Sequence, residues 1–115
     1  MDHKMKLAPA PFQRICDGKK TVEMRLYDEK RAKIRIGDRI EFENVETRQT
    51  LECTVIDLIR FNDFYALYAH FDKTELGYTA DEAASAEDMH AYYSPEQVKR
   101  YGVVAIKIRR TNDKA

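Results

Sequence analysis

Apolar and polar residues alternate in five short segments of the chain, and this pattern predicts strands. Successive side chains of a strand point to opposite faces, so a strand with one buried face has an apolar residue at every second position. The five segments are residues 6–8, 21–26, 39–44, 51–61 and 103–109. Segment 51–61 is apolar on much of both faces, which predicts a central strand. We expect its two faces to consist of Leu51, Cys53, Val55 and Asp57, and of Thr54, Ile56 and Leu58.

Apolar residues spaced three or four positions apart predict short helices between these strands. The expected helices cover about 11–17, 64–71, 80–89 and 95–101. Asn62 or Asp63 can cap the second of them, and Ser94 with Gln97 forms a capping box for the last. Short strands mixed with peripheral helices indicate the α+β class. Because strands lie at both ends of the chain, we expect a closed or nearly closed sheet.

Segment 21–26 carries the most informative polar row. Thr21, Glu23 and Arg25 share one face, with Lys19 and Lys20 at its entrance. The opposite face is apolar and consists of Val22, Met24 and Leu26. A hydroxyl, a carboxylate and a guanidinium in line can bind or process a polar ligand. They can equally form a solvated face, with an ion pair that contributes about 0–1 kcal/mol.

Composition restricts the class of protein. The chain has 115 residues, of which 43% are hydrophobic and 35% are charged. These values are typical of one globular domain and not of a disordered chain. No apolar run is long enough to span a membrane, and the first residues do not form a signal peptide. Cys16 and Cys53 lie in apolar patterns, so we expect reduced core thiols in a cytoplasmic protein with no membrane association.

The formal net charge is zero, but the charges are unevenly distributed. Residues 1–39 have a net charge of +5, residues 40–98 of −10 and residues 99–115 of +5. If the two ends of the chain meet in space, they create a basic face that the total conceals. Charges that simply cover the surface are the alternative.

Three sequence blocks, in this order, resemble an ASCH domain of the PUA-like superfamily. The first is the segment 11–26, which begins Pro-Phe and ends Gly-Lys-Lys-Thr-Val-Glu-Met-Arg-Leu. The second is Ile-Gly-Asp-Arg-Ile-Glu-Phe at 36–42, and the third is the segment 92–108, which begins Tyr-Tyr-Ser-Pro-Glu. The resemblance implies a single domain over 1–115 with its core at about 5–110. It also implies a small mixed β-barrel with flanking short helices and a cleft at the first block. ASCH and PUA-like domains are associated with RNA binding. Some small members hydrolyse the amide of N4-acetylcytidine, and others have been linked to RNA cleavage.

The resemblance also indicates catalytic candidates. In the amide-hydrolysing members a lysine, a threonine three residues later and a distant glutamate form the catalytic group. The lysine corresponds to Lys20, the threonine position is Glu23 in this chain, and the distant glutamate could be Glu75. A hydroxyl can attack a carbonyl, whereas a carboxylate beside Lys20 would keep its amine protonated.

We therefore expect a domain that binds RNA or a modified nucleoside and is a monomer. The expected ligand-binding residues are Lys19, Lys20, Thr21, Glu23, Arg25, Tyr92 and Tyr93. The arginine can contact a phosphate, Glu23 can accept from a cytosine-like amino group, and a tyrosine can stack on a base. The alternatives are an amidohydrolase acting on N4-acetylcytidine or a related acylated nucleoside, a ribonuclease-like activity, and a protein-interaction module that uses the acidic middle region.

We expect no metal and no cofactor. The histidines have no ligand spacing with the cysteines, and the chain lacks a glycine-rich nucleotide loop.

Overall fold

The computed structural model describes residues 2–111, so Met1 and residues 112–115 of the predicted domain lie outside it. Its strands are β1 (Asp2–Leu7), β2 (Val22–Leu26), β3 (Arg39–Asn44), β4 (Thr50–Phe61) and β5 (Val103–Arg110). Its helices are α1 (Pro9–Cys16), α2 (Phe64–His70), α3 (Pro95–Tyr101) and the 3-10 helices η1 (Arg31–Lys33) and η2 (Ala86–Ala91). All five predicted strands are confirmed, although the first begins at Asp2 instead of residue 6.

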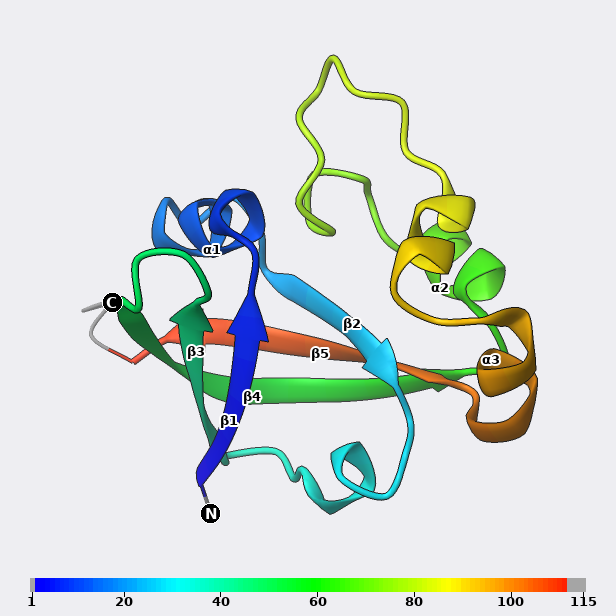
Figure 1. Ribbon diagram of the computed structural model, residues 1–115, viewed down its shortest axis with the longest axis horizontal. Helices are drawn as coiled ribbons and strands as arrows, with labels where there is room; N and C mark the ends of the chain where they lie inside the picture. Colours follow the sequence, from blue (N-terminus) through cyan, green and yellow to red (C-terminus); the bar gives the residue numbers. More distant parts are fainter. Residues whose placement is uncertain (1, 112–115) are drawn as a thin grey trace.

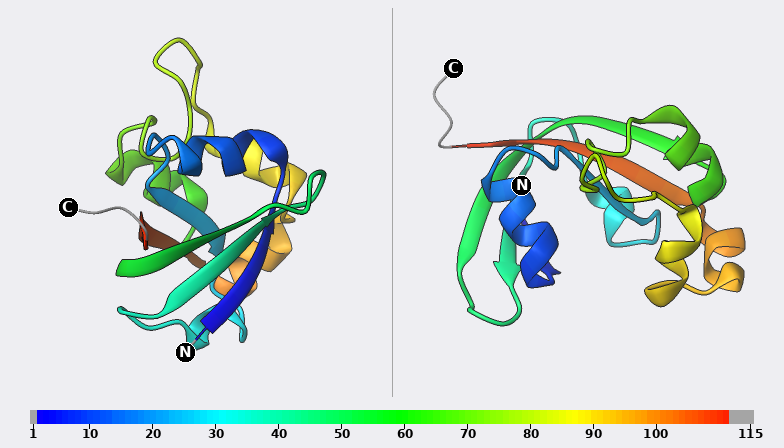
Figure 2. Two further views of the ribbon diagram at one scale, coloured as in Figure 1. Left: turned by 90° about the vertical axis from the view of Figure 1, so that its left-hand side faces the viewer. Right: turned by 90° about the horizontal axis from the view of Figure 1, so that it is seen from above.

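The strands form one sheet in the order β1-β3-β4-β5-β2, in which β1 is parallel to β3 and every other pair is antiparallel. The sheet curls strongly into a half-barrel, with β1 and β2 at its two edges (Figures 1 and 2). The expected α+β class and barrel-like sheet are thus confirmed, and the barrel stays open between β1 and β2. The central position of β4 is confirmed as well.

A bulge in β4 changes the predicted pattern of its faces. The register with β5 shifts between Val55 and Asp57, which leaves Ile56 as the extra residue, 43% exposed. One extra residue reverses the alternation beyond it. Leu58 therefore faces the same side as Val55 and packs on the same core, whereas the sequence predicted that it would share a face with Ile56.

The sheet packs a core on each of its faces. Inside the half-barrel, the first core is formed around Met5, Phe12, Ile40, Phe42, Val55, Val104 and Ile106. On the opposite face, the second core is formed around Val22, Met24, Leu26, Phe64, Leu67, Met89, Val98, Val103 and Ala105. The apolar side of β2 belongs to the second core. Glu23 and Arg25 pair with Ile106 and Val104 and so face the inside of the half-barrel.

Three of the four predicted helices are confirmed, and one is wrong. Ser94 caps α3 with a complete capping box, and Asp63 caps α2 by accepting from the amide of Ala66. Residues 79–85 form turns and coil instead of the start of a helix, and helical structure begins only with η2. The predicted capping contact does form, because the Glu82 carboxylate accepts from the amide of Thr79 at 2.7 Å. Ala83 and Ala84, which follow, are exposed, so no apolar face stabilises a helix over these residues.

The two basic ends of the chain meet at one end of the half-barrel. The amide of Ile108 donates to the carbonyl of Thr21 at 2.9 Å, and the Arg110 guanidinium donates to the carbonyl of Cys16 at 2.5 Å. Within residues 2–111, no helix is long and apolar enough to cross a membrane.

Candidate functional site

The main chain before β2 is anchored on two sides. At the end of α1, the amides of Lys19 and Lys20 both donate to the carbonyl of Arg14, at 2.9 and 3.0 Å. The amides of Thr21 and Val22 both donate to the carbonyl of Glu75, at 3.0 Å each. Lys20 is thus fixed between α1 and the turn that follows α2, with its side chain directed inward.

The Lys20 side chain is buried against a glycine. Lys20 is 6% exposed, and its Nζ lies 3.0 Å from Glu23 Oε1 and 3.3 Å from the carbonyl oxygen of Leu76. Gly77 has a φ of +105°, and a Cβ at this position would lie 2.9 Å from Lys20 Cδ. The glycine therefore provides both the backbone conformation and the space that the lysine needs.

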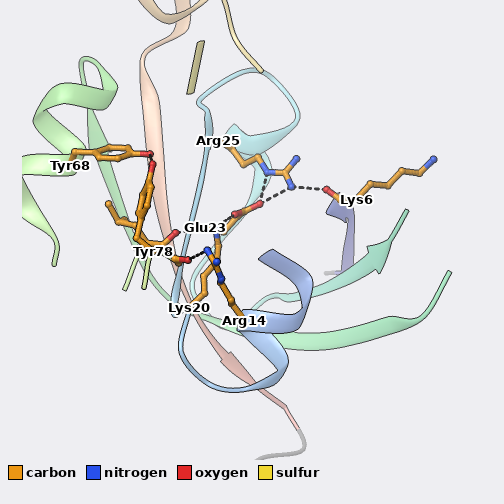
Figure 3. A network of polar contacts seen from close by, with 9 residues as sticks. Lys6, Arg14, Lys20, Glu23, Arg25, Tyr68 and Tyr78 are labelled. Atoms are coloured by element: carbon orange, nitrogen blue, oxygen red, sulfur yellow. Dashed lines mark hydrogen bonds and ion pairs between the residues drawn. The ribbon is translucent and has the colours of Figure 1, made fainter. Parts of the chain in front are cut away.

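Arg25 links the same carboxylate to the far edge of the sheet. Its Nε and Nη2 lie 2.8 and 2.7 Å from Glu23 Oε2, and Nη2 also donates to the carbonyl of Lys6 at 3.0 Å. Lys6 belongs to β1, so the arginine side chain bridges the open seam of the half-barrel. Figure 3 shows Glu23 between the two cations, with Arg25 directed toward Lys6. The row is a buried network, not a solvated strand face.

The charges in this network fix its protonation. Burial by itself would raise the pKa of Glu23, but Lys20 and Arg25 outweigh burial and hold the pKa at about 2. Burial would likewise lower the pKa of Arg25, but the charge of Glu23 and the neighbouring Tyr93 raise it. At neutral pH Glu23 is therefore ionised, between the side chains of Lys20 and Arg25.

A pocket of about 330 Å³ opens above the network. Lys20, Glu23 and Arg25 line it together with residues from β1, α1, α2 and the 76–93 segment. Four tyrosines contribute to its wall, namely Tyr68, Tyr78, Tyr92 and Tyr93. Tyr92 is 69% exposed, whereas Tyr93 is partly buried and stacks on Phe64 with ring centroids 5.9 Å apart. The pocket thus combines a charged base with an aromatic rim.

A hydrogen-bonded pair of tyrosines fixes one wall of the pocket. The Tyr78 hydroxyl donates to Asp88 Oδ2 at 2.7 Å and lies 2.8 Å from the Tyr68 hydroxyl (Figure 3). The three polar groups therefore form one hydrogen-bonded chain from Tyr68 through Tyr78 to Asp88. Burial first, and then both hydrogen bonds, raise the pKa of Tyr78, so its hydroxyl stays neutral. Arg14 lies at the same wall of the pocket, where it donates to the carbonyl of Gly77 and forms an ion pair with Glu82 at 3.2 Å.

The structure brings together five of the predicted site residues, which are Lys20, Glu23, Arg25, Tyr92 and Tyr93. Three others lie elsewhere. Lys19 is exposed beside α1, Thr21 contributes main-chain bonds, and the Glu75 carboxylate accepts from the amide of Asp72 at 3.2 Å. None of these three lines the pocket.

Sequence reasoning missed Arg14, Tyr68, Gly77, Tyr78 and Asp88 as pocket residues. Tyr68 does follow the apolar spacing of α2, and its ring packs beside the second core. The glycine after Leu76 was a usable signal, because an isolated glycine often marks a close approach of the backbone to another group. Arg14 and Tyr78 had no distinctive sequence context. Within residues 2–111, no group of three or more histidine, cysteine, aspartate or glutamate side chains could hold a metal ion.

This half-barrel, with a polar pocket at its seam, is the fold of a PUA-like domain. The chain belongs to the ASCH domain family, whose model matches residues 5–112. The structure is similar to the crystal structure of the hypothetical protein PH0355, with a TM-score of 0.81 and 32% identity over 96% of this chain and 99% of that one. It is also similar to the solution structure of protein PF0455 from Pyrococcus furiosus, with a TM-score of 0.70 and 32% identity over 98% of this chain and 100% of that one.

More distant similarity supports the fold alone. ASCH from Zymomonas mobilis superimposes with a TM-score of 0.63 at 16% identity, over 92% of this chain and 65% of that one. A search of the curated proteins found no match.

Proposed function

We propose that this chain binds RNA or a modified nucleoside, with one base held in the pocket above Lys20, Glu23 and Arg25. The buried three-residue network at the base of a tyrosine-rimmed pocket carries this proposal. A volume of about 330 Å³ lies within the range of small-molecule sites, roughly 300–1,000 Å³. Exposed tyrosine provides a stacking surface for a base, and such contacts contribute about 1–3 kcal/mol each. RNA binding has also been proposed for ASCH domains as a family.

The same network argues for binding rather than hydrolysis. With a pKa of about 2, Glu23 is a weak base at neutral pH. Its carboxylate lies 3.0 Å from Lys20 Nζ, so the lysine is held by a salt bridge and not by a nucleophile. Among the described residues that line the pocket there is no serine, threonine or cysteine. The position at which the family's amide hydrolases have a threonine thus contributes a salt bridge in this chain.

The occupied carboxylate also constrains the ligand. Both oxygens of Glu23 already accept from cations, so a cytosine-like amino group would have to compete with Lys20 and Arg25. Lys20 has two protein partners among the described residues, which leaves one of its three N–H groups for a ligand. The favoured ligand group is therefore an acceptor, such as a base carbonyl, an acyl carbonyl or a phosphate oxygen.

Fluorescence anisotropy with short single-stranded RNA tests this proposal. Lys20→Met keeps the length of the side chain but removes its donor, and we expect it to weaken binding about tenfold. Lys33→Met, on exposed η1 away from the pocket, is the matched control and should leave affinity unchanged. Urea unfolding of both variants separates lost binding from lost fold. Equal affinity for wild type and folded Lys20→Met would contradict the proposal.

Incubation with N4-acetylcytidine tests the alternative enzymatic function. We expect binding of this nucleoside, detected by calorimetry, without release of cytidine. Release of cytidine by the wild type that disappears in Lys20→Met would instead establish an amidohydrolase.

A further inference from the structure

A second and larger concavity lies outside the pocket, at the end of the sheet where α2 and α3 meet. Its volume is about 900 Å³, and it is lined by the end of β4, the start of α2, His90 of η2, and α3 with the glycine that follows it. Figure 1 places α2 and α3 side by side at this end of the molecule, away from α1. We call this concavity the α2–α3 groove. No part of the buried Lys20 network lines it.

The charges that line the α2–α3 groove are mostly positive. Arg60, Lys99 and Arg100 line it, and all three are exposed. The one carboxylate among its described lining residues, Asp63, is already used as the cap of α2. This local excess contrasts with residues 40–98 as a whole, whose net charge is −10. The groove is therefore an electrostatic site for an anionic partner.

Aromatic rings accompany these cations. Tyr65, on the first turn of α2, lines the groove and is 55% exposed. The Arg60 guanidinium lies over the ring of Tyr27, 3.9 Å from its centroid, which holds this cation in place. Exposed aromatic rings beside a row of cations are the combination with which proteins bind single-stranded nucleic acid, through base stacking and phosphate contacts.

The groove and the pocket share a wall. Phe64 lines the groove, Tyr93 lines the pocket, and their rings stack at an interplanar angle of 14°. The single helical segment η2 contributes Met89 to the pocket and His90 to the groove. An RNA strand that extends from the pocket past the exposed Tyr92 therefore crosses only this shared wall before it reaches the groove.

We propose that the α2–α3 groove binds the phosphodiester backbone of the RNA strand whose base occupies the pocket. This inference rests on the proposed function and adds a second contact region to it. Lys99 and Arg100 contact phosphates, and Tyr65 stacks on a base outside the pocket. An acidic peptide is the other anionic polymer that could use the cations. The exposed tyrosine favours RNA, because a peptide of carboxylates offers no ring to stack.

Two probes separate the groove from the pocket. A fluorescein-labelled hexanucleotide of uridine is long enough to engage both regions, whereas a nucleoside 5′-monophosphate occupies the pocket alone. The groove variant is Lys99→Ala combined with Arg100→Ala. Its matched control, Lys30→Ala with Lys33→Ala, removes two exposed cations beside η1. Tyr65→Ala tests the stacking contact independently of charge.

We expect the Lys99→Ala/Arg100→Ala variant to bind the hexanucleotide about tenfold more weakly. Its slope of log affinity against log salt should fall by about 1.4, at ~0.7 for each lost phosphate contact. Tyr65→Ala should weaken the hexanucleotide about fivefold or more. Neither change should affect the monophosphate, and the control pair should bind both probes as the wild type does.

Other outcomes overturn one proposal or the other. Wild-type hexanucleotide affinity in both the groove variant and Tyr65→Ala overturns the groove while leaving the pocket intact. Hexanucleotide binding that depends on the groove but is unchanged in Lys20→Met supports the groove and overturns the pocket. Binding of a labelled oligoglutamate peptide that needs Lys99 and Arg100, and that the hexanucleotide cannot displace, overturns RNA as the occupant of the groove.

Discussion

The pocket and the α2–α3 groove use the same residue types, cations beside tyrosines, in opposite environments. In the pocket Lys20 is 6% exposed, and its ammonium is held by a carboxylate and a carbonyl. In the groove Lys99 and Arg100 are exposed to solvent. Buried and paired cations have fixed positions and can discriminate between ligands. Exposed cations are screened by salt, and their side chains adapt to many different ligands. The difference suggests that one region selects a base and the other holds a strand.

The largest expected effect comes from removing the carboxylate of the pocket. Glu23→Ala leaves the buried Lys20 and the mostly buried Arg25 without their counter-ion, which costs about 3–5 kcal/mol of unfolding free energy. The matched control is Glu43→Ala, because Glu43 pairs with Arg48 at the same 2.7 Å that separates Glu23 from Arg25. The Arg48 side chain is 77% exposed, so this change should cost about 0–1 kcal/mol. Urea unfolding measures both, and similar losses would contradict the contrast between buried and exposed pairs.

Acid should weaken the protein through the same carboxylate. The pKa of Glu23 is lowered from 4.5 to about 2 in the fold, so its stabilisation is complete above pH 4.5 and is lost as the pH falls toward 2. The loss amounts to about 3 kcal/mol, at ~1.4 kcal/mol for each pH unit between the two values. In Glu23→Gln this part of the pH dependence should be absent. Thermal unfolding between pH 5 and 2 measures it, and parallel curves for wild type and Glu23→Gln would refute the assignment.

A comparison of two glycines should give a smaller loss of stability. Gly77 and Gly37 have similar positive φ values, +105° and +95°, but a Cβ on Gly77 meets Lys20 Cδ at 2.9 Å, whereas one on Gly37 meets nothing within 4 Å. Gly37→Ala should cost about 1–2 kcal/mol from backbone strain alone. Gly77→Ala should cost about 1 kcal/mol more and should also weaken RNA binding, because Lys20 must move. Equal costs in urea unfolding, with unchanged binding, would show that the Lys20 side chain adapts freely.

The smallest expected effect concerns the tyrosine wall. Tyr78→Phe removes the hydrogen bonds to Asp88 and Tyr68 while keeping the ring, and should cost about 1 kcal/mol of unfolding free energy. Tyr65→Phe, on the exposed first turn of α2, should change stability by less than ~0.5 kcal/mol. A Tyr78→Phe protein as stable as Tyr65→Phe would mean that the hydroxyl network contributes nothing to the fold.

Strand periodicity predicted the elements of the sheet well, because alternation of side chains is a local property. The same rule failed at Ile56, where one inserted residue reversed the alternation and exposed an isoleucine. The predicted helix at 80–89 is wrong even though its local capping signal was correct. Its capping contact formed as predicted, but a cap cannot sustain a helix without an apolar face to bury.

Only part of the candidate site could be predicted from the sequence. Lys20, Glu23 and Arg25 are close in sequence and belong to a recognisable family block, so the sequence alone was enough to select them. Tyr78, Asp88 and Arg14 reach the pocket from distant segments and carried no local signal. Glu75 was predicted as a site residue, but its side chain does not line the pocket. Its carboxylate accepts from the amide of Asp72, and its carbonyl anchors the main chain beside Lys20.

The sequence by itself determined that β2 has one apolar and one polar face, and that a carboxylate stands where the family's amide hydrolases have a threonine. Only the tertiary structure decided that the polar face is the sheltered one. The sheet curls toward Glu23 and Arg25, and Arg25 bridges the seam to Lys6, so a row that would be solvated on a flat sheet is enclosed. Enclosure depends on curvature and on segments far apart in the chain, and no local pattern of residues encodes either.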